Sequence, residues 1–287
     1  MPIHMMPEST WSQRMKNVIG ISLGASSQDF EFETSFLGAR LRVQRVGADG
    51  DPVKAARLLR HWSSRADAIG LGLVADSDRI GAANLGDAAQ RHAPAATLPL
   101  TTGARLADIF LEWAVRHTQD RLGHYFDNAK VLFFSGLAHA KLAAAMAEYS
   151  PNLRFADPLL QLGVPKLLDS IEALNLYGVG AHYVGDWAPP RVLPAELVKQ
   201  WTQYVLRKAM AHATVVVAPA HELDGFGLEE LAGKTLVTTT VNEQRLEGFK
   251  EKGVHLVIDA APLLHGHALD PSLLDAMILA GSGKSAD

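Results

Sequence analysis

An acidic residue follows a small-residue turn at a spacing that nucleotide-binding proteins use. Residues 131–134 are four apolar residues that predict a buried strand, and Ser135-Gly136 predicts a tight turn. An Ala-rich helix and a short strand follow, and Asp157 ends that second strand. Strand, turn, helix, strand and acid are typical of a dinucleotide-binding βαβ unit, in which the acid binds a ribose hydroxyl. The order predicts cofactor contacts at Ser135, Gly136 and Asp157.

The glycine series of such a unit is incomplete in this chain. A G-x-G-x-x-G series would need three glycines, and the chain has Gly136, Ala138 and Lys141 at those positions. The second glycine lets a pyrophosphate approach the backbone, and the third lets the helix pack closely on the strand. Because many βαβ units bind no nucleotide at this turn, both a nucleotide site and a purely structural unit stay open.

The amino-acid composition excludes several kinds of site and partner. The chain has 287 residues, 48% of them hydrophobic and 20% charged, with a net charge of −4, which is typical of a globular protein with small-molecule rather than nucleic-acid partners. It has no cysteine, so disulfides, thiolate nucleophiles and cysteine-based zinc sites are excluded, and redox chemistry would need a cofactor. No apolar run reaches the roughly 18 residues of a membrane span, and the first 16 residues lack the apolar core of a signal peptide. We expect a cytoplasmic protein without a membrane partner, and leave a homo-oligomer open.

The order of apolar runs and turns predicts two α/β domains with a cleft between them. Residues 52–71 read as a helix and a strand after an earlier strand at 18–23, which implies a parallel pair joined by a crossover. Residues 214–218 are hydrophobic without alternation, as in a parallel sheet covered on both faces. The C-terminal domain is therefore expected to be a Rossmann-like doubly wound parallel sheet. The expected division is a flexible tail over 1–16, an N-terminal substrate domain over 17–103, a connecting helix over 104–122 and the C-terminal domain over 123–287.

The strand ends of the first domain carry small, hydroxyl and acidic residues. The turn at 24–27 is rich in hydroxyls, and it either holds an anion through backbone N–H groups or only connects two elements. Asp49 and Asp51 would orient a substrate hydroxyl or hold a cation, although Asp51, before Pro52, equally suits a helix N-cap. Open α/β sheets bind ligands at the carboxyl ends of their strands. The expected substrate-binding residues are Ser22, Gly24, Ser26, Asp49, Asp51 and Gly72.

Three polar residues amid apolar neighbours are candidate general acids: Asp76, His182 and Lys166. Asp76 follows a strand that ends in glycine, where the alternative is a solvated loop of mixed charge. His182 lies in a stretch of glycines and aromatic residues, 177–187, whose composition suits a small-molecule pocket or a core. His265 and His267 lack a third ligand at metal-binding spacing, so no metal site is predicted.

Four stretches carry a resemblance to a known group: VIGISLGAS at 18–26, RVGADGD at 45–51, DAIGLG at 67–72 and GKTLVTTT at 233–240. Over most of residues 17–262 the chain resembles bacterial proteins known as quinate 5-dehydrogenase-like, and more distantly the shikimate/quinate and methylene-tetrahydrofolate dehydrogenase architecture. The resemblance implies a two-domain fold. It also implies NAD or NADP held between Ser135-Gly136, Asp157 and the strand end formed by Thr238, Thr239 and Thr240.

These observations predict an NAD(P)-dependent oxidoreductase that acts on a small polar metabolite in the interdomain cleft. Asp157 would favour NAD, because it would repel a 2′-phosphate, although Lys141 and Arg154 would reverse that preference. The alternative is a non-redox enzyme or ligand-binding protein of the same fold that holds an anionic metabolite. The incomplete glycine series and the hydroxyl-rich turns favour this alternative.

Overall fold

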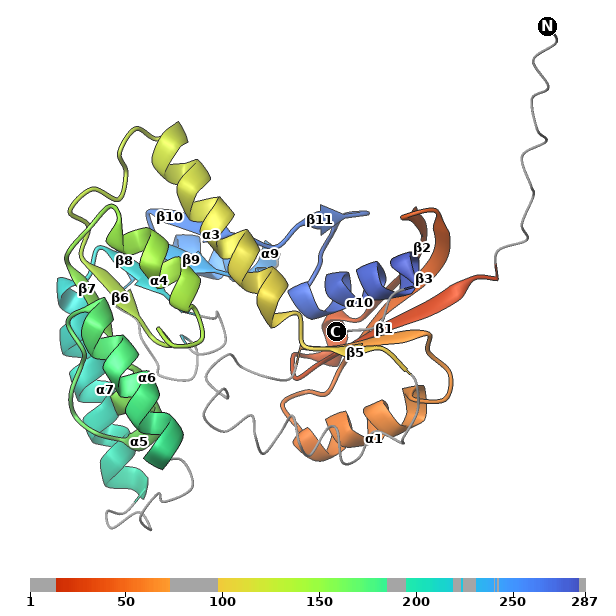
Figure 1. Cartoon of the computed structure of the whole chain (residues 1–287), viewed down its shortest axis with the longest axis horizontal. Helices are drawn as coiled ribbons and strands as arrows, with labels where there is room; N and C mark the ends of the chain where they lie inside the picture. The colour runs from red at the N-terminus through yellow and green to blue at the C-terminus, as the bar shows by residue number, and fades with distance from the viewer. Residues whose placement is uncertain are drawn as a thin grey trace, which may run out of the picture.

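Two five-stranded sheets form the centres of two lobes (Figure 1). The computed structural model describes residues 14–72, 98–184, 195–218, 223, 231–239, 241 and 243–283. The first sheet has the strand order β2-β3-β1-β4-β5 and the second has the order β10-β9-β8-β6-β7. The expectation of two α/β domains is therefore confirmed.

The described part of the first lobe is a mostly parallel sheet with one α-helix on each face. Its strands are β1 (Lys16–Ser22), β2 (Phe30–Phe36), β3 (Ala39–Gly47), β4 (Ala68–Gly72) and β5 (Leu100–Thr101), and only β2 runs antiparallel to its neighbour. Figure 1 shows α1 (Pro52–Trp62) and α10 (Pro271–Ser282) on opposite sides of this sheet. Because alternate side chains point to opposite faces, Ile19 packs on the α1 side while Val18 packs on the α10 side.

The second lobe is a parallel sheet covered on both faces. Its strands are β6 (Val131–Phe133), β7 (Leu153–Phe155), β8 (Val215–Val217), β9 (Thr235–Thr238) and β10 (Leu256–Asp259). One face packs against α3 (Ala104–Arg121), α4 (Ala140–Ala147) and α6 (Ile171–Val184), and the other against α7 (Ala195–His212) and α9 (Glu243–Glu251). Burial on both faces explains why β6, β8 and β9 are buried at every position, whereas β7, at the edge of the sheet, exposes Arg154.

The C-terminal helix belongs to the first sheet. Leu273 and Met277 of α10 share a buried cluster with Val18 and Leu41, whereas the sequence analysis had assigned residues up to 287 to the second domain. The helix also approaches at backbone distance, since a Cβ on Gly70 would lie 2.3 Å from the Ser272 carbonyl oxygen. An apolar helix face does not specify which of two sheets it covers, so the sequence pattern could not decide this.

A short hairpin leads the chain back to the first lobe before α10. It consists of β11 (Leu263–Leu264) and β12 (His267–Ala268). The ring of His267 stacks on that of Phe30 with centroids 4.3 Å apart, and the His265 ring lies 4.9 Å from that of Phe32. The two histidines therefore pack against aromatic side chains of β2.

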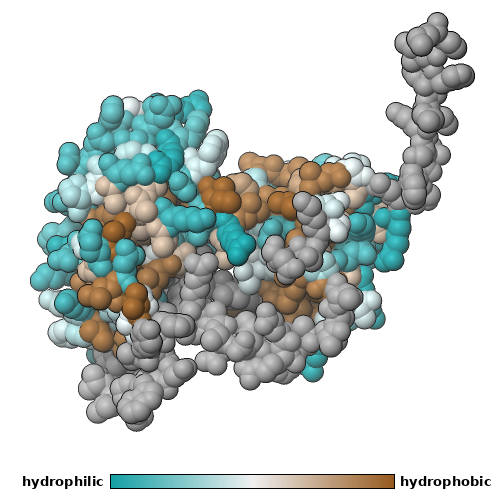
Figure 2. All heavy atoms as spheres, in the orientation of Figure 1, coloured by the Kyte–Doolittle hydropathy of each residue, from teal (hydrophilic) through white to brown (hydrophobic). Residues whose placement is uncertain are grey.

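Several large apolar side chains of the second lobe stay exposed. Leu176 and Val179 of α6, and Trp201 and Tyr204 of α7, are each at least half exposed. Figure 2 shows hydrophobic atoms on the side of the molecule where these helices lie. Among the described helices, none combines the length and the apolar character that crossing a bilayer requires.

The close approach of β4 and α10 gives a first prediction. We expect Gly70→Ala to lower the free energy of unfolding by about 1–3 kcal/mol, because the new methyl group meets backbone atoms of α10 that cannot move aside. Gly248→Ala is the control, since no atom lies within 4 Å of the added methyl group in the middle of α9, and alanine is the better helix former by about 0.5–1 kcal/mol. Urea denaturation of both variants measures the difference, and equal stabilities would contradict the packing.

Candidate functional site

The carboxyl edge of the second sheet contains the place where open α/β sheets bind ligands. The chain passes from β6 to β7 on one side, and β8 then lies on the other side of β6. Such a reversal of strand order leaves a crevice at the carboxyl ends of the two central strands. Ser135 and Gly136 follow β6 directly at this point, and α4 begins after them.

Asp157 holds the turn after β6. Its side chain is wholly buried, and its two carboxylate oxygens accept hydrogen bonds from the backbone N–H groups of Gly136 and Leu137, both at 2.9 Å. Burial raises the pKa of Asp157, although these two hydrogen bonds and the charge of His139 act in the opposite direction. The spacing expected from the sequence is present, and in this structure the carboxylate is closed off from solvent and binds the turn.

Gly136 is required by packing. A Cβ at this position would lie 2.3 Å from Cδ1 of Phe155, the last residue of β7. The residue that looks like the first glycine of a nucleotide-binding series is therefore fixed by the contact between two strands. Ser135, beside it, is also buried.

The start of α4 faces this edge without a side-chain cap. His139 is the N-cap residue and makes no capping hydrogen bond, and the first turn contains no acidic residue. The first N–H groups of a helix lack partners within the helix and carry a partial positive charge. This is the arrangement that binds phosphate groups at helix N-termini in nucleotide-binding folds.

Thr238 ends β9 at the same edge. Its side chain is 2% exposed, and among the described residues its Oγ1 has no hydrogen-bond partner. A buried hydroxyl without a partner is costly, so a ligand group that bonds to it would be favoured. Thr239 is half-buried, and Thr240 lies outside the described residues.

The first lobe gathers polar groups at the carboxyl ends of β1 and β3. The Ser22 hydroxyl accepts hydrogen bonds from the Gly24 N–H at 3.0 Å and from the Arg45 guanidinium at 3.2 Å. Asp49 binds the Ser26 N–H at 2.6 Å and pairs with Lys54. Asp51 accepts a hydrogen bond from the Val53 N–H and caps α1, so of the two alternatives the structure has the N-cap.

Arg45 and Asp270 also lie at this edge of the first lobe, and the sequence did not identify them as candidate site residues. Arg45 is mostly buried and pairs with Asp29 at 3.0 Å, and burial lowers its pKa although Asp29, Asp270 and Asp49 raise it. A Cβ on Gly72 would lie 3.2 Å from the carboxylate of Asp270. Asp270 is far from Gly72 in the chain, so no spacing rule connects the two, while Arg45 looked like one more basic residue on a half-exposed strand.

Of the three candidate general acids, only Lys166 has a described side chain. Lys166 is exposed in the connection between α5 (Asp157–Leu162) and α6. His182 lies in the last turns of α6, and Asp76 lies outside the described residues.

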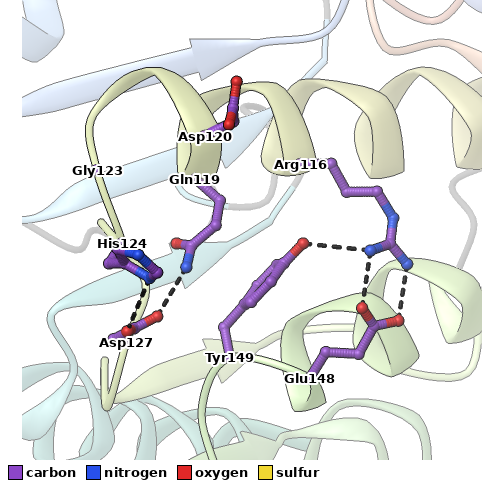
Figure 3. A pocket seen from close by; sticks show the side chains of 8 residues that line it. All are labelled: Arg116, Gln119, Asp120, Gly123, His124, Asp127, Glu148 and Tyr149. Carbon is purple, nitrogen blue, oxygen red and sulfur yellow. Dashed lines mark hydrogen bonds and ion pairs between the residues drawn. The ribbon is translucent and has the colours of Figure 1, made fainter.

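A hollow of about 490 Å³ lies at the opposite edge of the second sheet (Figure 3). It is lined by Arg116, Gln119, Asp120, Gly123, His124, Asp127, Glu148 and Tyr149. These residues precede β6 and β7, and therefore surround the amino ends of the strands. The Arg116 guanidinium donates two hydrogen bonds of 2.8 Å to Glu148, and Gln119 donates one to Asp127, as Figure 3 shows. The charges that line the hollow largely neutralise one another, and it lies on the wrong edge for a Rossmann-type ligand.

Asp157→Asn tests how the turn after β6 is held. We expect the free energy of unfolding to fall by about 1–3 kcal/mol, because the asparagine NH₂ would face one backbone N–H and leave it without an acceptor. Asp51→Asn is the matched control, because asparagine caps helices as well as aspartate does. Chemical denaturation compares the two variants, and an Asp157→Asn protein as stable as the control would contradict the geometry.

Asp49 gives a prediction about pH. Its hydrogen bonds with Lys54 and Ser26 lower its pKa to about 2, so its contribution to stability is complete above the ordinary value near 3.8 and is lost as the pH falls through 2. We expect Lys54→Met to move the titration of the Asp49 carboxyl carbon, followed by NMR, back toward the ordinary value. An unchanged midpoint would show that Lys54 does not pair with Asp49 in solution.

The chain is similar to two family models and to a solved structure. No curated protein matches the chain. A hetero-hexameric glutamate dehydrogenase from Thermus thermophilus, solved with Leu bound, is similar at 16% identity with a TM-score of 0.39, over 96% of this chain and 70% of that one. Residues 17–102 match a family model described as "Domain of unknown function (DUF8753)". Residues 105–287, more than half of the chain, match a second model, and the chain therefore belongs to the family described as "Domain of unknown function (DUF8754)".

Proposed function

We propose that the chain is an NAD(P)-dependent oxidoreductase whose substrate, a small polar metabolite, binds between the two lobes. The observation that carries the proposal is the buried hydroxyl of Thr238, which has no hydrogen-bond partner among the described residues. It ends β9 at the edge where the uncapped start of α4 also lies. A hydroxyl acceptor and a helix N-terminus are the groups that bind the polar and the phosphate parts of a dinucleotide.

The junction of the lobes supports a substrate between them. Gly103, the N-cap of α3, touches the start of α10, because a Cβ there would lie 2.4 Å from the carbonyl carbon of Pro271. In the same helix Asp108 reaches His139, just after β6. The carboxyl edge of the second sheet thus adjoins the first lobe, whose own carboxyl edge carries Ser22, Ser26 and Arg45.

The chemistry fits the residue types of the chain. A nicotinamide cofactor would supply the hydride transfer, and this reaction needs no protein nucleophile. The protein would bind and orient both partners, with Arg45 and the hydroxyls of the first lobe facing a polar substrate. Asp76, His182 and Lys166 stay our candidates for the general acid. Because Asp157 is buried in the turn, it gives no preference between NAD and NADP, and both belong in the test.

A second candidate function is a non-redox enzyme or ligand-binding protein that holds an anionic metabolite at the same edge. The observation in its favour is that Asp157 already binds the N–H groups of Gly136 and Leu137. In this conformation, these two backbone N–H groups are not available to bind a pyrophosphate. A smaller anion would need only the start of α4.

Thr238→Val tests the proposal. Without ligand we expect the variant to be as stable as the wild type or more stable by up to about 1 kcal/mol, because it removes a buried hydroxyl that lacks a partner. Binding of NAD or NADP, measured by calorimetry, should weaken roughly tenfold, the value of one hydrogen bond of about 1.4 kcal/mol. Thr235→Val on the same strand is the control: it should lose about 1 kcal/mol of stability, because its hydroxyl bonds to that of Tyr125, with unchanged affinity.

The outcomes separate the two candidate functions. Saturable binding of NAD or NADP that Thr238→Val weakens supports the oxidoreductase. A rise in melting temperature with quinate or another small anion, but with neither nucleotide, supports the second candidate. Nucleotide binding that Thr238→Val leaves unchanged would remove the observation on which the first proposal rests.

A further inference from the structure

Three charged or titratable side chains are buried together beside the turn after β6. Asp108, His139 and Asp157 are 6%, 4% and 0% exposed. Charged side chains are rarely buried to this degree unless they are paired. The three residues come from α3, from the N-cap of α4 and from the start of α5, so they join three elements at one point.

The first contact of the group joins α3, the helix between the lobes, to the turn after β6. His139 Nδ1 lies 3.7 Å from Oδ1 of Asp108, within the distance of an ion pair when the imidazole is protonated. The backbone N–H of His139 also donates to the Ser135 carbonyl oxygen at 3.3 Å. The histidine is therefore held at its backbone by the turn and at its ring by α3.

His139 and Asp157 also interact electrostatically. Burial raises the pKa of Asp157, which means that the ionised carboxylate is the form that burial penalises. The positive charge of His139 lowers the pKa of Asp157 and so favours the ionised form, which accepts both N–H groups of the turn. Burial, and then the charge of Asp157, raises the pKa of Tyr177 in α6 to about 12, so this phenol stays neutral at ordinary pH.

We propose that Asp108 and His139 are positioning residues, which hold the turn of residues 135–139 and the start of α4 in the shape that binds the ligand. The use of the turn as a ligand site rests on the proposed function. The contacts that hold the turn do not depend on that function. Asp108 lies against the His139 ring, and the His139 N–H binds the Ser135 carbonyl oxygen. Asp157 holds the same turn through the N–H groups of Gly136 and Leu137. Because α3 also touches α10 of the first lobe, the same contacts couple the turn to the lobe junction.

Hydrogen exchange of the full chain without ligand measures the hold directly. Asp108→Asn and His139→Gln should each lower the protection of the Gly136 and Leu137 amides, corrected for intrinsic exchange rates, roughly tenfold relative to the wild type. The double variant should lose no more than the larger single effect, because the residues act as one chain. Glu112→Gln, one turn further along α3 and paired with Arg116 on the surface, should leave the protection unchanged.

Several results would overturn the proposal. Gly136 and Leu137 amides that exchange in the wild type as fast as unprotected amides would do so without any variant, which matters if a substitution prevents folding. Losses that add in the double variant, or an Asp108→Asn protein that keeps the wild-type protection, would do so too. Calorimetry with NAD and NADP then addresses the ligand: the two single variants should bind roughly tenfold more weakly. A wild type that binds neither nucleotide refutes the proposed function. The hydrogen-exchange measurement still tests whether Asp108 and His139 hold the turn.

Discussion

The close backbone contact between β4, the start of α3 and the start of α10 is the constraint on which the arrangement of this protein depends. Two glycines make it possible: Gly70 lets α10 lie against β4, and Gly103, with a φ of +67°, lets α3 begin beside Pro271. A Cβ at either position would overlap backbone atoms, which cannot move as the end of a flexible side chain can. The chain therefore returns from the second lobe to complete the core of the first, and α3 leaves from the same point.

This junction gives the carboxyl edge of the second sheet its neighbours. The start of α3 contributes Asp108 to the buried group around His139, so the helix that leaves the junction also touches the turn after β6. In that turn, packing and electrostatics determine what the backbone offers a ligand. Phe155 requires glycine at position 136, and Asp157 accepts hydrogen bonds from two N–H groups. The start of α4 has no side-chain cap, and the Thr238 hydroxyl has no hydrogen-bond partner among the described residues.

Local patterns predicted the parts of the fold that depend on neighbours in the chain. The pair Asp51-Pro52 marked the start of α1, because capping and the fixed φ of proline act within one turn. The βαβ unit around residue 136 was also predictable from apolar runs and a turn. The contacts of Asp157 could not be predicted in this way. The acid has the spacing of a ribose ligand, yet it is buried beneath the turn, because periodicity carries no information about which way a strand-end side chain points.

The sequence by itself determined the α/β class, the parallel strands of the second lobe and the collection of hydroxyl and acidic residues at the strand ends of the first. These follow from hydrophobic periodicity and turn chemistry, which act over a few residues. Only the tertiary structure decided that α10 covers the first sheet, that Arg45 and Asp270 join the first-lobe edge, and that Asp108 meets His139. These contacts join residues far apart in the chain, and they depend on how close two backbones approach and on how buried charges are compensated, which no local spacing encodes.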